Sequence, residues 1–337
     1  MINLFFLAGP LNMGIANYIR KDLPIEDVNV ALVDERYQLD CIDEWNKVIY
    51  IRRMKDYFGL KSLVRKDLKN DIAKIIEMID SDNELQIFLP HLWHTLGNIF
   101  YNRVVDLGYT VRLCNMPEGI GSLRIVKSNT NQYVVNILEN YFKKIVMMFI
   151  GEKYTVFYDK NDLVGIKYFD AVYSFLPKAI EGKVKEVKCI RFPHITKKNS
   201  IKRTCVVLGQ PRSFGLSVLE WEKYMQELAQ YCANEFSEYQ LLYKPHYREK
   251  GNYKIFERNG FLLYQGNNGL EKDLLNGRNI DVLISICSTG LVSAKVILGN
   301  NIECYAYKCY QILKEYNYHD AKEIKRLFEL ADVKFIE

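Results

Sequence analysis

Short apolar runs alternate with longer amphipathic stretches through the first half of the chain. The apolar runs have the length of buried strands and lie at residues 3–8, 28–33, 86–89 and 110–114. Apolar residues at helical spacing occupy residues 60–79 and 98–107. Because strands and helices alternate, we expect a parallel sheet with helices on both of its faces.

The same pattern begins again after a polar segment, residues 195–202, that has the composition of a linker. Further strands are predicted at residues 203–208, 240–244, 281–286 and 301–307, with helices at residues 217–236 and 289–298. We therefore predict an α/β chain with two doubly wound, Rossmann-like domains, residues 1–195 and residues 202–310. A basic amphipathic helix is expected at residues 320–330, so that residues 311–337 cross back to the first domain.

The composition narrows the class of protein. The chain has 337 residues, of which 49% are hydrophobic, enough for buried cores, and its net charge of +5 is not gathered in a tail. This excludes a nucleic-acid binder that works through a basic tail. No apolar run reaches the roughly 18 residues that span a bilayer, and the densest, residues 145–150, follows Lys143 and Lys144. The first residues read as a buried strand rather than a signal peptide.

The cysteines point to a compartment. There are eight, most lie inside apolar runs, and none has CxxC spacing. This distribution favours reduced, packed thiols over a disulfide framework, and we expect a cytoplasmic protein.

One segment has the properties of a phosphate site. The apolar run at residues 281–286 leads directly into Ser288, Thr289 and Gly290, and a predicted helix follows. Free backbone N–H groups, two hydroxyls and the positive end of a helix dipole would converge there. The same residues also suit simple capping of the helix, and the sequence leaves both interpretations open.

A second candidate anion site follows the strand at residues 240–244. If the chain stays extended, Lys244, His246 and Arg248 point the same way, because side chains in a strand alternate. They would then form a compact cationic patch. Pro245 permits the extension but can also start a turn, which would leave His246 an ordinary surface residue.

A third candidate is a lone acid in a loop. Glu118 lies between Pro117 and Gly119, shortly after the predicted strand at residues 110–114. A carboxylate in this place can act as a general base on a hydroxyl within hydrogen-bond reach. An acid in a loop that contains glycine can equally be solvated and without a chemical role.

The order of these segments along the chain resembles a known family. Glu118-Gly119, then Lys244-Pro245-His246, then Ser288-Thr289 is similar to the motif order of the bacterial sialyltransferases and polysialyltransferases of capsule and lipooligosaccharide synthesis. Those motifs are an acidic-acidic-Gly triplet, a His-Pro pair and a Ser-Ser/Thr pair. The run at residues 208–211, Leu-Gly-Gln-Pro, looks like the family-52 sialyltransferases. Two positions depart from the pattern, since Pro117 replaces the first acid and Tyr247 replaces the proline after the histidine.

The resemblance implies a fold and an activity. The fold would be GT-B, in which two Rossmann-like domains face a central cleft. The activity would be an inverting transfer of sialic acid, or of a related nonulosonic acid, from a CMP-activated donor to a hydroxyl of a bacterial surface glycan, with no metal or other cofactor required. Such an enzyme would work in the cytoplasm, at the inner face of the cell membrane, with peripheral membrane contact.

The resemblance also assigns roles. Glu118 would deprotonate the acceptor hydroxyl, and His246 would bind and protonate the departing CMP phosphate. A loop such as residues 266–269 would border the nucleotide base, although a plain turn is the simpler interpretation. The residues expected to bind the donor are Lys244, Arg248, Ser288, Thr289, Gly209, Gln210 and Gly266.

Other functions remain open from the sequence. A UDP-sugar transferase or epimerase of the same fold is one alternative, and a non-catalytic member that binds glycan or nucleotide is another. Two further patterns suggest a metal only weakly: Asp80-Ser-Asp82 is an isolated DxD at the end of a helix, and His91 with His94 lacks a third ligand. The segment at residues 9–14 lacks the GxGxxG spacing of a dinucleotide site but could border the acceptor.

Overall fold

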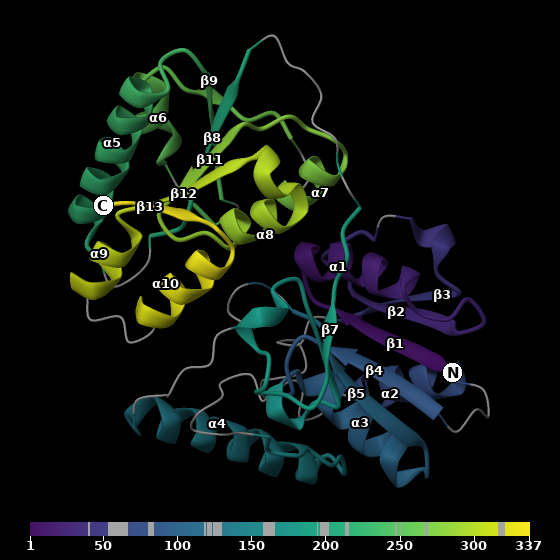
Figure 1. Cartoon of the computed structure of the whole chain (residues 1–337). Helices are drawn as coiled ribbons and strands as arrows, with labels where there is room; N and C mark the ends of the chain where they lie inside the picture. Colours follow the sequence, from purple (N-terminus) through teal and green to yellow (C-terminus); the bar gives the residue numbers. More distant parts are fainter. Residues whose placement is uncertain are drawn as a thin grey trace. The chain divides into compact units, whose positions relative to one another are not determined.

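The structure is a computed structural model (Figure 1). It describes residues 1–39, 41–52, 67–79, 84–117, 119, 123, 130–157, 166–193, 195, 202–212, 216–246, 248–249, 251–266, 269–315 and 321–337. The chain divides into two compact units, Met1–Ile190 and Arg191–Glu337. The division lies five residues before the domain end at residue 195 that the polar segment suggests.

The described residues of the first unit form a parallel sheet of seven strands. The strands are β1 (Ile2–Leu7), β2 (Val28–Asp34), β3 (Lys47–Ile51), β4 (Glu84–Leu89), β5 (Thr110–Asn115), β6 (Ala171–Ser174) and β7 (Val187–Cys189). Their order is β3-β2-β1-β4-β5-β6-β7, so the order reverses between β1 and β4. At that reversal Ile2 pairs with Val28 on one side and with Leu85 on the other.

The helices of the first unit alternate with these strands. They are α1 (Pro10–Lys21), α2 (Asp67–Glu77), α3 (Thr95–Asp106) and α4 (Thr130–Phe149), with short 3-10 turns η1 (Ile42–Glu44), η4 (Ile166–Tyr168) and η5 (Pro177–Ala179). The core between sheet and helices is aromatic: Phe5 and Phe88 are fully buried and stack with their ring centroids 4.1 Å apart. Stacking of this kind adds to the stabilisation from area burial.

In the second unit, the part of the chain that the structure describes forms a parallel sheet of six strands. The strands are β8 (Thr204–Leu208), β9 (Gln240–Lys244), β10 (Leu262–Leu263), β11 (Val282–Ser285), β12 (Glu303–Tyr307) and β13 (Lys334–Ile336), in the order β10-β9-β8-β11-β12-β13. The helices are α5 (Val218–Glu235), α6 (Tyr253–Arg258), α7 (Leu270–Leu275), α8 (Thr289–Leu298), α9 (Cys309–Glu315) and α10 (Ala321–Leu330), with a 3-10 turn η6 (Gly299–Asn301). The prediction of two doubly wound α/β units is confirmed.

Local sequence explains where these elements begin. Ser217 caps α5 by accepting a hydrogen bond from the Glu220 N–H, and the Glu220 carboxylate accepts one from the Ser217 N–H in return. This reciprocal capping box fixes the helix start from four residues of sequence. The predicted helix at residues 60–79 overlaps α2, which begins at Asp67, and residues 53–66 lie outside the described part of the chain.

The last segment differs from the expectation that residues 311–337 cross back to the first domain. β13 pairs in parallel with β12, with Tyr305 opposite Lys334 and Tyr307 opposite Ile336. These residues therefore complete the second sheet and belong to the second unit. The strand is only three residues long, too short for its alternation to be recognised in the sequence.

Candidate functional site

The candidate donor residues lie along the carboxyl edge of the second sheet. All its strands are parallel, so the segments that follow them emerge at one edge. The order reverses between β8 and β11, and ligands of open α/β sheets bind beyond such a switch point. Gly209 and Gln210 follow β8, whereas Ser288 and Thr289 come soon after β11. The structure thus brings these two segments together at the switch point.

Gln210 ties the two segments to each other. Its Nε2 donates to the Cys287 carbonyl at 2.6 Å, and its Oε1 accepts from the Cys287 N–H at 2.7 Å. Ser285 Oγ donates to the Leu208 carbonyl at 2.9 Å from the same strand end. These hydrogen bonds tie the backbone just before Ser288 to β8 and to the residues that follow β8. Gln210 is a positioning residue for the start of α8.

Ser288 begins α8 as its N-cap. Its Oγ accepts a hydrogen bond from the Gly290 N–H at 3.2 Å, so the capping interpretation of this segment is correct. A Cβ at position 290 would lie 2.8 Å from a methyl carbon of Leu208 and 2.9 Å from one of Leu270, so the glycine lets the start of α8 pack closely against β8 and α7. Capping leaves the Ser288 hydroxyl proton able to donate, and the helix dipole favours an anion at this end.

The chain does not stay extended after Lys244, so the predicted alternation of Lys244, His246 and Arg248 is wrong. The Glu249 N–H donates to the His246 carbonyl at 2.9 Å, which closes a turn. Inside this turn the Arg248 N–H donates to His246 Nδ1 at 3.1 Å. Since Nδ1 is an acceptor, the proton of the neutral imidazole is on Nε2. Burial, together with the nearby Arg248, lowers the pKa of His246 below 6.5.

Lys244 belongs to a separate cluster near β10. Its Nζ lies 3.5 Å from Asp273 Oδ2 and 4.4 Å from the centre of the Tyr264 ring. The Tyr264 hydroxyl donates to the same Asp273 oxygen at 2.9 Å. Gly266 closes this cluster, because a Cβ there would lie 2.7 Å from the Tyr264 ring and 2.8 Å from Asp273. The charge of Lys244 is thus largely matched by a buried carboxylate.

Sequence reasoning missed Glu249. Its carboxylate accepts from the Tyr243 hydroxyl at 2.7 Å and from the His246 N–H at 3.2 Å. Burial raises the pKa of this carboxyl, and the two hydrogen bonds oppose the rise. Gly209 makes room for it, since a Cβ at position 209 would lie 2.2 Å from Glu249 Oε2. Position 249 follows the predicted patch directly, but nothing in the sequence indicates that its side chain turns back to Gly209.

Two buried asparagines bind backbone carbonyls at the carboxyl edge of the first sheet, around the segment before Glu118. Asn12, in the first turn of α1, donates from Nδ2 to the Pro117 carbonyl at 2.8 Å. Asn115, the last residue of β5, donates from Nδ2 to the Pro90 carbonyl at 2.8 Å. Both asparagines are buried. Glu118 itself lies outside the described residues, so its general-base role stays a prediction.

The metal patterns of the sequence do not form a metal site in the described part of the chain. His94 Nδ1 accepts from the Gly97 N–H at 3.2 Å and caps α3, and burial lowers its pKa to about 4. Burial also holds the pKa of His91 well below 6.5. Among the residues that the structure describes, no three His, Cys, Asp or Glu side chains are grouped to hold a metal ion. Asp80 and Asp82 lie outside the described residues.

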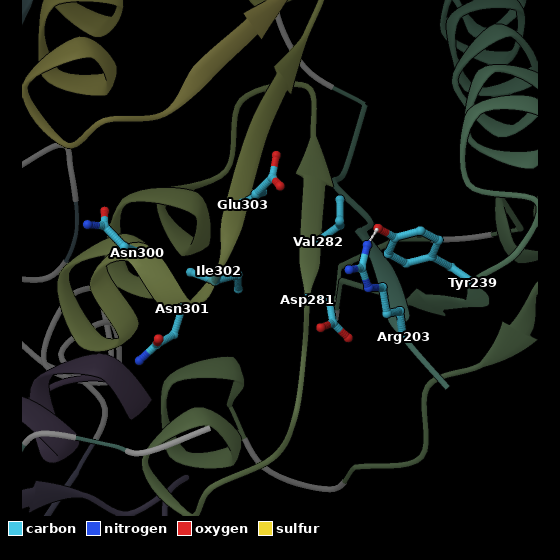
Figure 2. Close-up of a pocket in the computed structure, with 8 residues that line it drawn as sticks. All are labelled: Arg203, Tyr239, Asp281, Val282, Asn300, Asn301, Ile302 and Glu303. Carbon is cyan, nitrogen blue, oxygen red and sulfur yellow. Dashed lines mark hydrogen bonds between the residues drawn. The ribbon is translucent and has the colours of Figure 1, made fainter. Parts of the chain in front are cut away.

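A pocket of the second unit lies at the opposite, amino edge of its sheet (Figure 2). It has a volume of about 160 Å³, and Arg203 in its wall donates to the Tyr239 hydroxyl at 3.0 Å. Asp281, another wall residue, accepts from the Thr204 N–H at 2.7 Å. These polar groups hold the beginnings of strands. The pocket is therefore distinct from the edge that carries the candidate donor residues.

No family model and no curated protein sequence matches the chain. Among solved structures, an α/β-galactoside α-2,3-sialyltransferase of Photobacterium phosphoreum is similar over 99% of this chain and 98% of its own, with a TM-score of 0.61 and 12% identity. The GT-B domain of a Photobacterium damselae sialyltransferase gives a TM-score of 0.56 with 12% identity, covering 99% of this chain and 100% of that domain. The chain has the GT-B fold. A Photobacterium sp. JT-ISH-224 2,6-sialyltransferase, in complex with CMP and lactose, gives a TM-score of 0.55 with 12% identity, covering 99% and 78% of the two chains.

The GT-B fold predicted from the motif order is confirmed over the whole chain. In this GT-B chain, each described residue expected to bind the donor lies in the second unit, at the carboxyl end of β9 or after β8, β9, β10 or β11. None of the described helices is long and apolar enough to span a bilayer.

Proposed function

We propose that this GT-B chain is a glycosyltransferase that moves sialic acid, or a related nonulosonic acid, from a CMP-activated donor to a hydroxyl of a bacterial surface glycan. The transfer proceeds with inversion and needs no metal. One observation carries the proposal: the Ser288-capped start of α8 and the segment after β8 are joined by Gln210 at the switch point of the second sheet. That edge offers hydroxyls, amides and a helix dipole to a phosphate.

The charge at this edge suits a leaving group with one phosphate. In the free chain, burial and the nearby Arg248 lower the pKa of His246, and the neutral ring carries its proton on Nε2. A bound phosphate raises that pKa, so the ring takes up a second proton in the complex. Lys244 is paired with Asp273. A diphosphate leaving group would require more positive charge, from a metal or from further Lys and Arg side chains. The CMP of an activated nonulosonic acid carries a single phosphate.

The chemistry follows from these roles. The Glu118 carboxylate takes the proton of the acceptor hydroxyl as its oxygen attacks the anomeric carbon. The bond from that carbon to the phosphate oxygen breaks and the electron pair leaves with CMP. His246, which is an imidazolium once the phosphate is bound, donates its Nε2 proton to the phosphate and returns to the neutral ring. Ser288 and Thr289 bind the same phosphate through hydroxyls and helix-terminal amides. The proposal predicts that Glu118 and His246 reach one donor molecule from the two units.

Two further observations support the assignment. Asn12 and Asn115 hold the carboxyl edge of the first sheet, and the Asn12 bond to the Pro117 carbonyl fixes the residue before Glu118. Similar structures are sialyltransferases by name, and one of them contains CMP and lactose. A nucleotide donor and a glycan acceptor are therefore the natural ligands to test. We place the enzyme in the cytoplasm, at the inner face of the cell membrane.

The test combines ligand binding with transfer. CMP, UDP and GDP are compared by thermal unfolding, where a ligand that binds only the native chain stabilises it by about 2.7 kcal/mol at 100 times its Kd. Transfer is then measured from CMP-sialic acid to lactose. We expect Glu118→Gln to lower the transfer rate by about 100-fold or more while CMP still stabilises the chain. His246→Ala should weaken both CMP binding and transfer.

Glu26→Gln is the matched control, because Glu26 is an exposed carboxylate elsewhere in the first unit. It should leave transfer unchanged. Stabilisation by UDP and not by CMP would favour a UDP-sugar transferase or epimerase. CMP binding without transfer to any glycan would favour a non-catalytic member, an outcome that the proline at position 117 makes worth testing. Full activity of Glu118→Gln would overturn the assigned base.

A further inference from the structure

Helix α4 turns an apolar surface outward. Large apolar side chains occupy its solvent side, each of them at least 46% exposed. They are Val134, Val135, Leu138, Tyr141, Phe142, Ile145, Met148 and Phe149. Their spacing of three, four and seven residues places them in one stripe along the helix. We call this stripe the α4 apolar face.

The opposite side of α4 fixes this orientation. Met147 is fully buried, and Asn140 is 6% exposed. The Asn140 Oδ1 accepts from the buried Tyr154 hydroxyl at 3.1 Å, which ties the helix to the segment after it. Figure 1 shows α4 at the margin of the first unit. The usual arrangement of a surface helix, with apolar side chains inward and polar side chains outward, is therefore reversed in α4.

Lysines surround the C-terminal half of the same helix. Lys144 is exposed, and Lys143 pairs with Glu139 at 3.0 Å one turn earlier. Lys153, in the segment after the helix, is 61% exposed and pairs with Asp106 at 2.8 Å. Lys69 reaches this place from α2, since its Nζ lies 3.4 Å from the Cβ position of Gly151. None of these lysines is part of the α4 apolar face, so the stripe is uncharged. At its border Lys143 and Lys153 are matched by Glu139 and Asp106, and Lys144 and Lys69 add positive charge to these pairs.

We infer that the α4 apolar face binds a lipid membrane with anionic headgroups and lies in the plane of the interface. An uncharged stripe with Phe and Leu side chains and bordering lysines is the composition of an interfacial helix. At 20 residues the helix is about 30 Å long, and its lysines lie where headgroup phosphates would meet them. A second copy of the chain would present the same positive border, whereas anionic headgroups complement it.

The test uses the full chain and vesicles, without nucleotide or acceptor, so its result does not depend on the proposed function. Binding is measured by co-sedimentation with two kinds of vesicle. One is made of phosphatidylcholine alone, and the other of phosphatidylcholine and phosphatidylglycerol in equal parts. Leu138→Asp should weaken binding about 10- to 100-fold, because one large apolar side chain no longer enters the interface. Lys144→Glu should weaken binding to the anionic vesicles only, and added salt should have the same effect as this substitution.

Leu219→Asp is the matched control. Leu219 is 78% exposed near the start of α5, against 63% for Leu138, and it lies outside the α4 apolar face. We expect it to bind vesicles like the unaltered chain. Phe149→Ser, with Phe149 79% exposed, repeats the test without a new charge, and thermal unfolding checks that each variant is folded.

Three results would overturn the inference. The unaltered chain fails to bind anionic vesicles, or Leu138→Asp and Leu219→Asp weaken binding equally. The third result is a dimer in sedimentation without lipid that both Leu138→Asp and Phe149→Ser convert to a monomer. The α4 apolar face would then be an interface between two copies of the chain.

Discussion

Gly209 is the position where one added methyl group should disturb the candidate site most. A Cβ there would lie 2.2 Å from Glu249 Oε2 and 2.5 Å from the Tyr243 hydroxyl oxygen, so Gly209→Ala clashes with both side chains. Tyr243 cannot move easily, because it is fully buried and its ring stacks on Phe256 with centroids 4.1 Å apart. We therefore expect the Glu249 carboxylate to be displaced toward solvent and the backbone at position 209 to shift away from the Tyr243 ring.

The cost follows from the bonds that are lost. Displacing Glu249 leaves the Tyr243 hydroxyl without its acceptor at 2.7 Å and the His246 N–H without its acceptor at 3.2 Å. A hydrogen bond to a charged group contributes about 1.5–3 kcal/mol, and overpacking costs about 1–3 kcal/mol. Glu249 is half-buried, so water replaces part of this loss. We expect Gly209→Ala to lower the free energy of unfolding of the second unit by about 2–4 kcal/mol.

Urea unfolding can isolate this unit by tryptophan fluorescence. Trp221 packs in the same buried cluster as Tyr243, whereas Trp45 and Trp93 belong to the first unit. In a background with Trp45→Phe and Trp93→Phe, the emission reports only the second unit. The reasoning about Gly209 would be refuted if Gly209→Ala unfolded within about 0.5 kcal/mol of its background.

Gly14→Ala is the matched control for the added methyl group. Gly14 lies inside α1, and a Cβ there meets nothing within 4 Å. Alanine is the better helix former, so this substitution should stabilise the first unit by about 0.5–1 kcal/mol. In a Trp221→Phe background, the tryptophan fluorescence comes from Trp45 and Trp93 and reports the unfolding of the first unit. A loss of stability in Gly14→Ala would show that the contact distances do not decide these outcomes.

Two further predictions concern buried charge. His94 has a pKa of about 4 in the folded chain against 6.5 as its ordinary value, so the unfolded chain binds the proton first as pH falls. Between pH 6.5 and pH 4 the free energy of unfolding of the first unit should therefore fall by about 3 kcal/mol through this group. His94→Asn can still accept a hydrogen bond from the Gly97 N–H, and it should remove that part of the pH dependence measured by urea unfolding. Equal slopes for the two chains would contradict the buried, neutral imidazole. Among the described residues, Lys244→Met leaves the buried Asp273 carboxylate with the Tyr264 hydroxyl as its side-chain partner, and it should destabilise the second unit by about 3 kcal/mol. Lys244→Met with Asp273→Asn should recover part of this stability, and a double variant no more stable than the single one would argue against the pairing.

The sequence pattern was sufficient to predict strands and helix starts, because these depend on residues that are neighbours in the chain. The apolar runs predicted at residues 28–33 and 110–114 lie within β2 and β5, and the Ser-Thr-Gly turn begins α8 as expected. The family resemblance added Gly209 and Gln210 to the candidates, and the structure joins their segment after β8 to the segment after β11. The expected alternation of side chains failed after Lys244, because a turn that begins at His246 replaces the extended strand.

The alternation of elements, the doubly wound architecture and the candidates at the strand ends could all be predicted from local sequence, because periodicity and capping are encoded within a few residues. Three features became known from the folded chain: Lys244 faces Asp273, Glu249 lies against Gly209, and α4 turns its apolar side outward. Each of these depends on which surfaces lie opposite one another after folding. A helical period shows that a helix has two faces, but packing against the rest of the unit selects the one that is buried.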